Sequence, residues 1–280
     1  MTKIVCCSVV KNCGRYLEKI FKNLDNLQKN INTKEFICVF VYDNCTDNSE
    51  SLLINFKKQS KYKVNVCKIE NKSPFRTVRI AKARNKCLDI IYNQIKNVDY
   101  HIMFDSDNVN SKLWNTTIIH NYLNDDSKWD AISFNKKNYY DIWALLYNDY
   151  KHHFWGFGRN SRKVINFIKK DISNLLNNSN TDIIDCISAF NGLTIYKTQK
   201  FKGIAYDGFY KNVKLYINDK ERLISLNLLR NKLKDNTINI VENIKPHRMI
   251  YPEEQCEHIN YHLAAIKNNS VQIKISKYCI

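Results

Sequence analysis

Strand and helix patterns alternate through the first 105 of the 280 residues of this chain. Short apolar runs rich in branched residues predict strands, and apolar residues repeating every three or four positions predict helices between them. This alternation is typical of βαβ units, which build a mostly parallel sheet with helices on both faces. The sequence therefore predicts an α/β fold. The expected strands are 3–10, 35–42, 63–69 and 100–105, and the expected helices are 15–27, 49–58 and 78–95.

The alternation weakens after about residue 110, but the chain offers no clear linker and no internal repeat. Its length suits one large domain with a sizeable core. An asparagine-rich polar stretch, 174–182, predicts a loop. We expect apolar strand segments within 183–196, helices at 221–233 and 254–267, and a last strand at 271–276.

A short acidic motif, Asp105-Ser106-Asp107, follows the apolar run 100–104 directly. If that run is a buried strand, its carboxyl end delivers two carboxylates to the sheet edge at which open α/β sheets bind ligands. One carboxylate can then hold a divalent cation while the other reaches a ribose hydroxyl or a second metal position. A solvated acidic turn is the alternative interpretation of so short a motif.

A second polar loop, 42–49, begins at the end of the second expected strand. In a parallel sheet its Asp43 lies on the same edge as Asp105, where it could bond a ribose or a base. Asp47 in the same loop is about as well explained as the cap of the following helix.

The third expected helix carries Arg76, Arg79 and Lys82 at every third position, away from its apolar stripe. Cations in the first turn of a helix oppose the helix dipole. A bound diphosphate would compensate, and arginine matches phosphate oxygens in a bidentate way. The alternative is a solvated basic face with acidic neighbours.

A late segment places Glu254, Glu257, His258 and His262 at helical spacings. A carboxylate and one or two imidazoles on one face could supply a general base and a metal ligand. The order is not the H-E-x-x-H of zinc proteases, and no cysteine pair completes a tetrahedral site. A surface helix with capping glutamates is the alternative.

Together these motifs resemble the nucleotide-sugar domain of glycosyltransferases with the GT-A fold. The resemblance rests on Asp43, the helix ending at Arg84-Asn85, the motif Asp105-Ser106-Asp107 and the Cys256-Glu257-His258 segment, in this order. That last segment is similar to a branch of the class found in large DNA viruses. The resemblance covers 3–108 and, thinly, 186–262.

The resemblance implies a single GT-A domain over 1–280, with a nucleotide-sugar-binding half at 1–110 and an acceptor-binding half at 111–280. It further implies a metal-dependent transfer of a sugar from a nucleoside diphosphate donor, expected to be a UDP-sugar, to an acceptor hydroxyl on a glycan or protein. The implied cofactor is Mn²⁺ or Mg²⁺.

Donor-side residues carried over by the resemblance surround the nucleotide and its sugar. These are Val9, Val10 and Asn12 beside the base, Asp43 on the base or ribose, Arg79 and Arg84 facing the donor, and Asp105 on the ribose or metal.

On the metal and acceptor side, the resemblance assigns Asp107 to the metal, Glu257 to the role of base, and His258 or His262 to the metal shell. The segment 189–193 is similar to the loop between nucleotide and acceptor. The usual acidic pair is replaced by Glu254-Gln255-Cys256-Glu257, so the choice between Glu254 and Glu257 and the stereochemical outcome stay open.

A formal net charge of +17 suits an anionic partner. However, lysines spread over the whole chain, together with scarce glycine and proline, can also follow from biased codon usage. We expect the ten scattered cysteines to be free thiols. With neither a membrane-span pattern nor a signal-peptide pattern, the expectation is a soluble cytoplasmic protein.

Two rival functions stay open. A sugar-1-phosphate nucleotidyltransferase also uses acids at a strand end, but it would want a glycine-rich phosphate loop after the first strand, where only Gly14 is present. A non-catalytic binder of nucleic acid or another polyanion explains the charge and the aromatics, but not the acids on one edge. Among those aromatics, Trp143 and Tyr147 are expected in the core, and 155–158 could line an acceptor groove.

Overall fold

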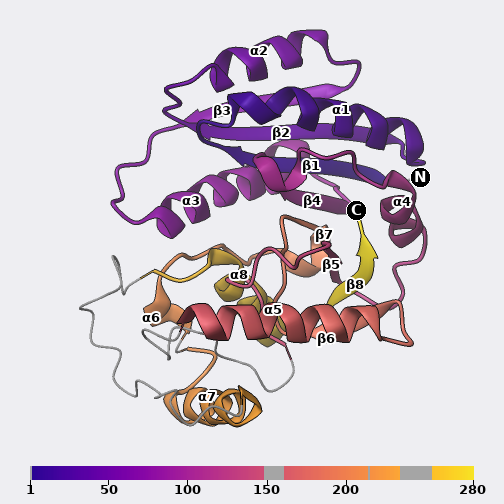
Figure 1. Cartoon of the computed structure of the whole chain (residues 1–280). Coiled ribbons are helices and arrows are strands. Elements are labelled where there is room, and N and C mark those ends of the chain that lie inside the picture. Colours follow the sequence, from indigo (N-terminus) through magenta and orange to yellow (C-terminus); the bar gives the residue numbers. More distant parts are fainter. Residues whose placement is uncertain (1, 148–160, 214, 234–253) are drawn as a thin grey trace.

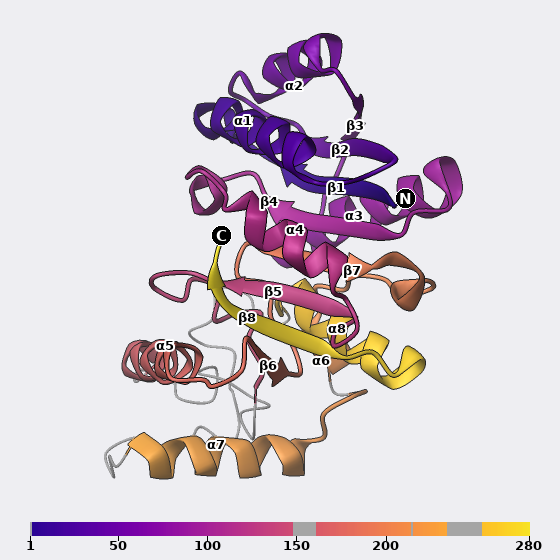
Figure 2. The same ribbon diagram turned by 90° about the vertical axis from the view of Figure 1, so that its right-hand side faces the viewer.

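The computed structural model describes residues 2–147, 161–213, 215–233 and 254–280, and within them it contains one eight-stranded mixed sheet. The strand order is β3-β2-β1-β4-β7-β5-β8-β6, and Figure 2 shows the strands following one another in this order from β3 at the top to β6 near the bottom. The expected acceptor-groove residues 155–158 lie outside the described residues.

The first four strands are parallel neighbours, and six of the eight strands run in the same direction. The predicted α/β fold with a mostly parallel sheet is therefore confirmed. The reversed strands are β7, between β4 and β5, and β6 at the edge. The strands are β1 (Lys3–Val10), β2 (Glu35–Asp43), β3 (Lys63–Ile69), β4 (Tyr100–Asp105), β5 (Ala131–Asn135), β6 (Ile183–Cys186), β7 (Leu193–Lys197) and β8 (Ile273–Cys279).

Helices cover both faces of the sheet, as the alternating pattern requires (Figure 1). One face packs against α1 (Gly14–Asn30), α2 (Ser49–Gln59) and α4 (Thr116–Asn124). The other packs against α3 (Arg76–Asp89), which continues as a π-helical turn over Ile90–Ile95, and against α8 (Glu257–Asn269). The remaining helices are α5 (Ser161–Asn177), α6 (Tyr210–Val213) and α7 (Asp219–Leu233).

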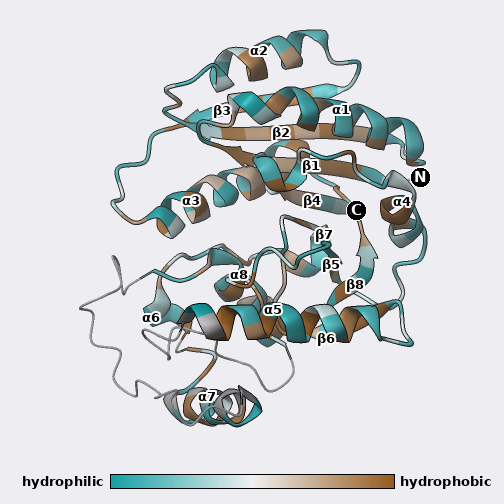
Figure 3. Ribbon diagram, viewed as in Figure 1, coloured by the Kyte–Doolittle hydropathy of each residue, from teal (hydrophilic) through white to brown (hydrophobic). Residues whose placement is uncertain are grey.

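The central strands are buried on both faces because successive side chains point to opposite sides. In β1, Cys6 joins the cluster under α1 and α2, whereas Val5 and Cys7 join the cluster under α3 and α8. Figure 3 shows the result, with β1 and β2 mostly hydrophobic and much of α1 hydrophilic where it faces outward. A third cluster lies between α5 and the β8 side of the sheet. All ten cysteines are free thiols, and five of them are buried in these clusters, in line with the expectation.

Three expected elements differ from the structure in their limits. The predicted helix 254–267 starts only at Glu257, because Glu254 makes an isolated bridge to Phe209 instead. The predicted loop 174–182 is helical up to Asn177. Trp143, expected in the core, is 44% exposed, while Tyr147 is buried as expected.

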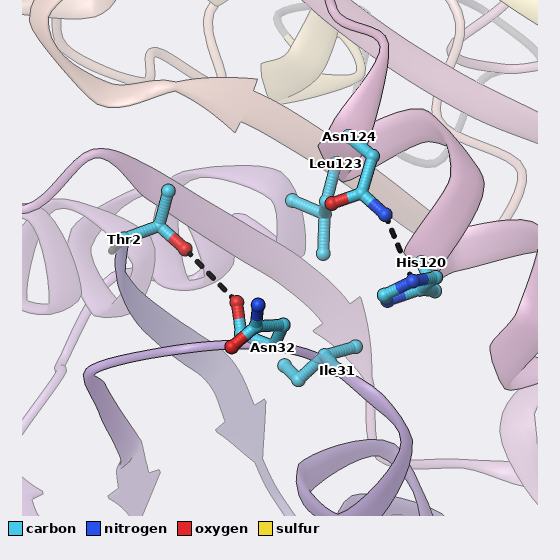
Figure 4. Close-up of a pocket in the computed structure, with 6 residues that line it drawn as sticks. All are labelled: Thr2, Ile31, Asn32, His120, Leu123 and Asn124. Atoms are coloured by element: carbon cyan, nitrogen blue, oxygen red, sulfur yellow. Dashed lines mark hydrogen bonds between the residues drawn. The ribbon is translucent and has the colours of Figure 1, made fainter.

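The carboxyl ends of β2, β1 and β4 meet at one edge of the sheet, where Val9 of β1 pairs with both Val41 and Asp105. A hollow of about 200 Å³ lies at the opposite edge, where β1 and β2 begin (Figure 4). It is lined by Thr2, Ile31, Asn32, His120, Leu123 and Asn124. In the described part of the chain, no helix is long and apolar enough to cross a membrane.

Candidate functional site

The centre of the candidate site is Arg84, which α3 holds on its buried face with 2% of its surface exposed. Its Nη2 donates a hydrogen bond to Asp105 Oδ1 at 2.9 Å, and its Nε lies 2.9 Å from Glu257 Oε1 in an ion pair. The guanidinium carbon also lies 4.6 Å from the ring centroid of Phe190. Arg84 therefore joins the end of β4 to the first turn of α8. The expectation that Arg84 faces the donor is replaced by an interior position between two carboxylates.

The charge balance around Arg84 favours additional positive charge. Burial lowers the pKa of Arg84, but Glu257 and Asp105 outweigh burial and raise this pKa above its ordinary value. Burial raises the pKa of Asp105 to about 7; Arg84 opposes this shift, and the neighbouring acids Asp107, Asp141 and Glu257 add to it. One buried cation thus has four carboxylates around it, and a second cation would favour their ionised forms.

The acidic motif alternates in direction at the end of β4. Ser106 turns inward, where its Oγ lies 2.6 Å from Ser8 Oγ. Asp105 and Asp107 stay half-buried on either side of it. Oδ1 of Asp107 accepts the Val109 N–H at 3.0 Å and so begins the 3₁₀ turn Asn108–Asn110. The capping role expected for an acidic turn is present, and it engages one oxygen of Asp107.

A turn at Asn191-Gly192 holds the backbone of Asp105 in place. The Gly192 carbonyl accepts the Asp105 N–H at 2.9 Å and the Asn110 Nδ2 group at 2.7 Å. Asn110 Nδ2 also donates to the Asp105 carbonyl at 2.8 Å. Gly192 has a φ of 92° and Asn191 a φ of 48°, the left-handed region that glycine and asparagine adopt most readily. The segment 189–193 therefore packs directly against the carboxylate motif.

The same turn positions Asp141, a site residue that the sequence analysis missed. Asn191 Oδ1 accepts the N–H groups of Tyr140 at 2.8 Å and Asp141 at 3.0 Å. Burial raises the pKa of Asp141 to about 6, and the nearby Glu257 adds to this shift. The missing signal was β5, which the sequence analysis did not predict. With β5 in place, a carboxylate a few residues beyond Asn135 would have been expected on the binding edge.

On the other side of β1, Asp43 is only 7% exposed, and its Oδ1 has no hydrogen-bond partner among the described residues. Its Oδ2 lies 3.7 Å from Lys11 Nζ. Asn12 is exposed, with a φ of 54°, and its Oδ1 accepts the Thr46 N–H at 2.8 Å, which ties the β1 and β2 loops together. A buried carboxylate oxygen without a partner at a sheet edge is costly unless a ligand satisfies it.

Three nearby residues have structural positions. Asp47 accepts the N–H groups of Gly14 at 2.9 Å and Ser49 at 3.0 Å, so its capping interpretation is confirmed. Val9 is half-buried at the edge, but Val10, also expected beside the base, is 3% exposed and packs into the core cluster under α1.

The expected basic face of α3 is explained within the chain. Arg79 Nη1 donates to the carbonyl oxygens of Ser73 and Pro74, each at 2.8 Å, and not toward the Asp105 edge. Glu254 Oε1 accepts the Thr77 N–H at 2.8 Å and the Thr77 hydroxyl at 3.1 Å. A carboxylate at the amino end of α3 offsets the repulsion between the helix dipole and its cations, so a diphosphate is not needed for that purpose.

The two histidines of α8 are buried and neutral. His262 contacts Ser188 Oγ at 2.8 Å and Tyr196 Oη at 3.0 Å through its two ring nitrogens, and burial lowers its pKa to about 3. His258 stacks on Phe190 at 3.7 Å, and burial lowers its pKa well below the ordinary value. Its Nε2 has no hydrogen-bond partner and lies 3.7 Å from Glu257 Oε1. Of the two, only His258 retains an uncommitted nitrogen.

The carboxylates fit a divalent ion that is shared with a ligand. Within the described ranges, no three His, Cys, Asp or Glu side chains gather closely enough to hold an ion by themselves. Mg²⁺ and Mn²⁺ favour oxygen ligands, and Mg²⁺ is commonly held by one or two carboxylates together with phosphate oxygens and water. Asp105 and Asp107, at the binding edge, suit that arrangement.

No protein-family model and no curated protein matches the sequence. Three solved structures have a similar arrangement. Residues 1–349 of S. aureus TarS in complex with UDP have a TM-score of 0.42 and 16% identity, over 82% of this chain and 56% of that chain. The Pyrobaculum calidifontis mannosyltransferase in complex with GDP-Man and Mn²⁺ has a TM-score of 0.40 and 14% identity, over 73% and 47%.

The third is the glucosyl-3-phosphoglycerate synthase of Mycobacterium tuberculosis in complex with Mn²⁺, UDP and glucosyl-3-phosphoglycerate. Its TM-score is 0.40 at 10% identity, over 72% of this chain and 59% of that chain. The chain thus spans roughly half the length of the solved structures it resembles.

Proposed function

We propose that this protein is a metal-dependent glycosyltransferase of the GT-A type that transfers a sugar from a nucleoside diphosphate donor, expected to be a UDP-sugar, to a hydroxyl of a glycan or protein. The observation that carries the proposal is the pair Asp43 and Asp105, which end the two parallel strands flanking β1. Such an edge accommodates a nucleoside on one side of β1 and a diphosphate on the other.

On the nucleoside side, Asp43 Oδ1 is proposed to accept a proton from the base or ribose, because it is buried without a partner. Val9 and Asn12 border this position. Asp105 is proposed to contact the ribose or the metal, and Asp107 to bind the metal through the oxygen that does not cap the 3₁₀ turn. We leave Arg79 out of the donor site because its guanidinium bonds the carbonyls of its own loop.

When bound, the ion would neutralise charge that develops on the leaving diphosphate. Glu257 is the proposed base and His258 its neighbour. The acceptor O–H proton moves to the carboxylate, the acceptor oxygen bonds to the sugar C1, and the bond from C1 to the phosphate oxygen breaks to release the nucleoside diphosphate. Arg84 keeps Glu257 ionised and fixed in direction, which a base must be before the transfer. Glu254 is excluded from this role by its bonds to Thr77.

The test is calorimetric binding of UDP and GDP to the purified protein with Mn²⁺ and then with EDTA. We expect metal-dependent binding of one nucleotide, which Asp107→Ala abolishes. Glu257→Gln should keep that binding and lower sugar transfer by about 10²–10⁴-fold. Equal nucleotide binding with and without metal would contradict the site assignment.

The two rival functions make different predictions. Gly14 already donates its N–H to Asp47, so the loop after β1 does not offer the open amides of a phosphate loop that a sugar-1-phosphate nucleotidyltransferase would use. A polyanion-binding protein would bind RNA with a steep dependence on salt and would bind neither UDP nor GDP. The calorimetric experiment followed by an RNA titration separates these alternatives.

A further inference from the structure

We propose that residues 139–144 form the acceptor subsite, in which the carboxylate of Asp141 and the exposed rings of Tyr140 and Trp143 bind a sugar of the acceptor. The inference rests on the proposed function and adds to it the class of acceptor, a glycan with hydroxyls on one side and an apolar ring face on the other.

The first observation is the orientation of the aromatic residues in this segment. Tyr139 and Ile142 are at most 2% exposed and belong to the third core cluster. Tyr140 is 47% exposed and Trp143 is 44% exposed. Two buried side chains therefore anchor the segment, and two large rings lie at the surface on either side of Asp141. Flat aromatic surface combined with a few polar groups is the usual lining of a small-molecule site.

The second observation is the environment of Asp141. Its Oδ1 accepts the Ala144 N–H at 3.2 Å, so a simple structural explanation is that it caps this turn. Hydrogen bonds to backbone N–H groups favour the ionised form of a carboxyl and lower its pKa. The pKa of Asp141 is instead raised, because burial and Glu257 outweigh the turn. A residue needed only as a cap would avoid this cost at an exposed position.

The third observation places Asp141 beside the proposed donor site. Asn191 Oδ1 holds the backbone of Tyr140 and Asp141, while the next residue, Gly192, accepts the Asp105 N–H. Burial raises the pKa of Tyr140, and the charges of Asp107 and Asp105 add to the shift, so this phenol faces the same carboxylates. Arg84 provides a further polar group here, because its buried Nη1 has no hydrogen-bond partner among the described residues.

The experiment measures binding of methyl hexopyranosides by saturation-transfer NMR, in the presence of UDP and Mn²⁺, and in parallel the affinity for UDP by calorimetry. We expect the wild-type protein to bind at least one of these glycosides. Asp141→Asn and Trp143→Ala should each weaken that binding by about tenfold or more. The affinity for UDP should change by less than about threefold, a small change on the scale of a lost hydrogen bond.

Asparagine at position 141 can still accept the Ala144 N–H, so a purely structural cap predicts no change in glycoside binding. Ile54→Ala is the control for removal of an exposed apolar side chain, because Ile54 is 39% exposed on α2 at the far side of the sheet. Unchanged glycoside binding in both variants, or no glycoside binding by a wild-type protein that binds UDP, overturns the subsite. Failure of the wild-type protein to bind UDP or GDP overturns the proposed function itself.

Discussion

The ion pair between Arg84 and Glu257, with 2.9 Å between Nε and Oε1, connects the middle of α3 to the first turn of α8. Both side chains are almost fully buried, and the same guanidinium also binds Asp105 at the end of β4. One positive charge therefore compensates two carboxylates on different elements. The arrangement makes the local stability of the site depend on a single residue.

We predict that Arg84→Met lowers the free energy of unfolding by about 3–5 kcal/mol, because removing one member of a buried ion pair leaves the other charge uncompensated. Urea unfolding monitored by circular dichroism measures the change. Arg15→Met removes an exposed arginine and serves as the control. The double variant Arg84→Met, Glu257→Gln should recover part of the loss. A loss below about 1 kcal/mol, typical of exposed ion pairs, would contradict the structural role of Arg84.

The raised pKa values of Asp105 and Asp141 predict a pH-dependent stability. The folded protein keeps these carboxyls protonated up to about pH 7 and about pH 6, whereas in the unfolded chain they ionise near pH 4. Their contribution to stability is therefore fully present below about pH 4 and is lost as the pH rises through the folded values. Asp141→Asn should flatten the fall in unfolding free energy between about pH 4 and 6. Urea unfolding at several pH values tests this, with the exposed Asp185→Asn as control; parallel curves for wild type and Asp141→Asn would contradict it.

Asp43→Asn should weaken nucleotide binding by about tenfold or more, because a ligand hydrogen bond to a charged acceptor is lost. The folded protein should lose little stability, since Asp43 Oδ1 has no partner to lose. Calorimetric titration of UDP measures the first effect and thermal unfolding the second. A variant that binds UDP as tightly as the wild type would remove Asp43 from the donor site.

Glu254→Gln should lower stability by about 0.5–2 kcal/mol, the range measured for helix caps, without changing nucleotide binding. The reason is its pair of bonds to Thr77 at the start of α3. In a double-variant cycle with Thr77→Val the losses should not add, because both changes remove part of one contact. Glu18→Gln, an exposed glutamate on α1, is the control. Loss of nucleotide binding in Glu254→Gln would assign this residue to the site and not to the helix.

The parts of the fold that local pattern determines could be predicted from the sequence. The limits of β1 and β3 matched the structure, and β2 and α2 differed by one residue, because each element carries its own apolar period and polar boundary. The placement of Asp43 and Asp105 on one edge followed from the parallel order of the strands, which the pairing of β1 with β2 and β4 confirms.

Contacts between distant segments could not be predicted. The basic spacing on α3 suggested a diphosphate, but the compensating charge is Glu254, which a local pattern cannot place at that helix end. Arg84 carried no sign of burial, because its ion partners come from β4 and α8. Asp141 was missed since β5, only five residues long, gives too short an apolar run to recognise.

The Asn191-Gly192 turn gives the two sides of the site a fixed register that does not depend on the rings at the surface. Its hydrogen bonds reach the backbone N–H groups of Asp105, Tyr140 and Asp141. Side chains at positions 140 and 143 can therefore be exchanged without altering the groups that fix this spacing. Under the proposed function, a library varied at these two positions would sample new acceptors while the donor-binding edge stays constant.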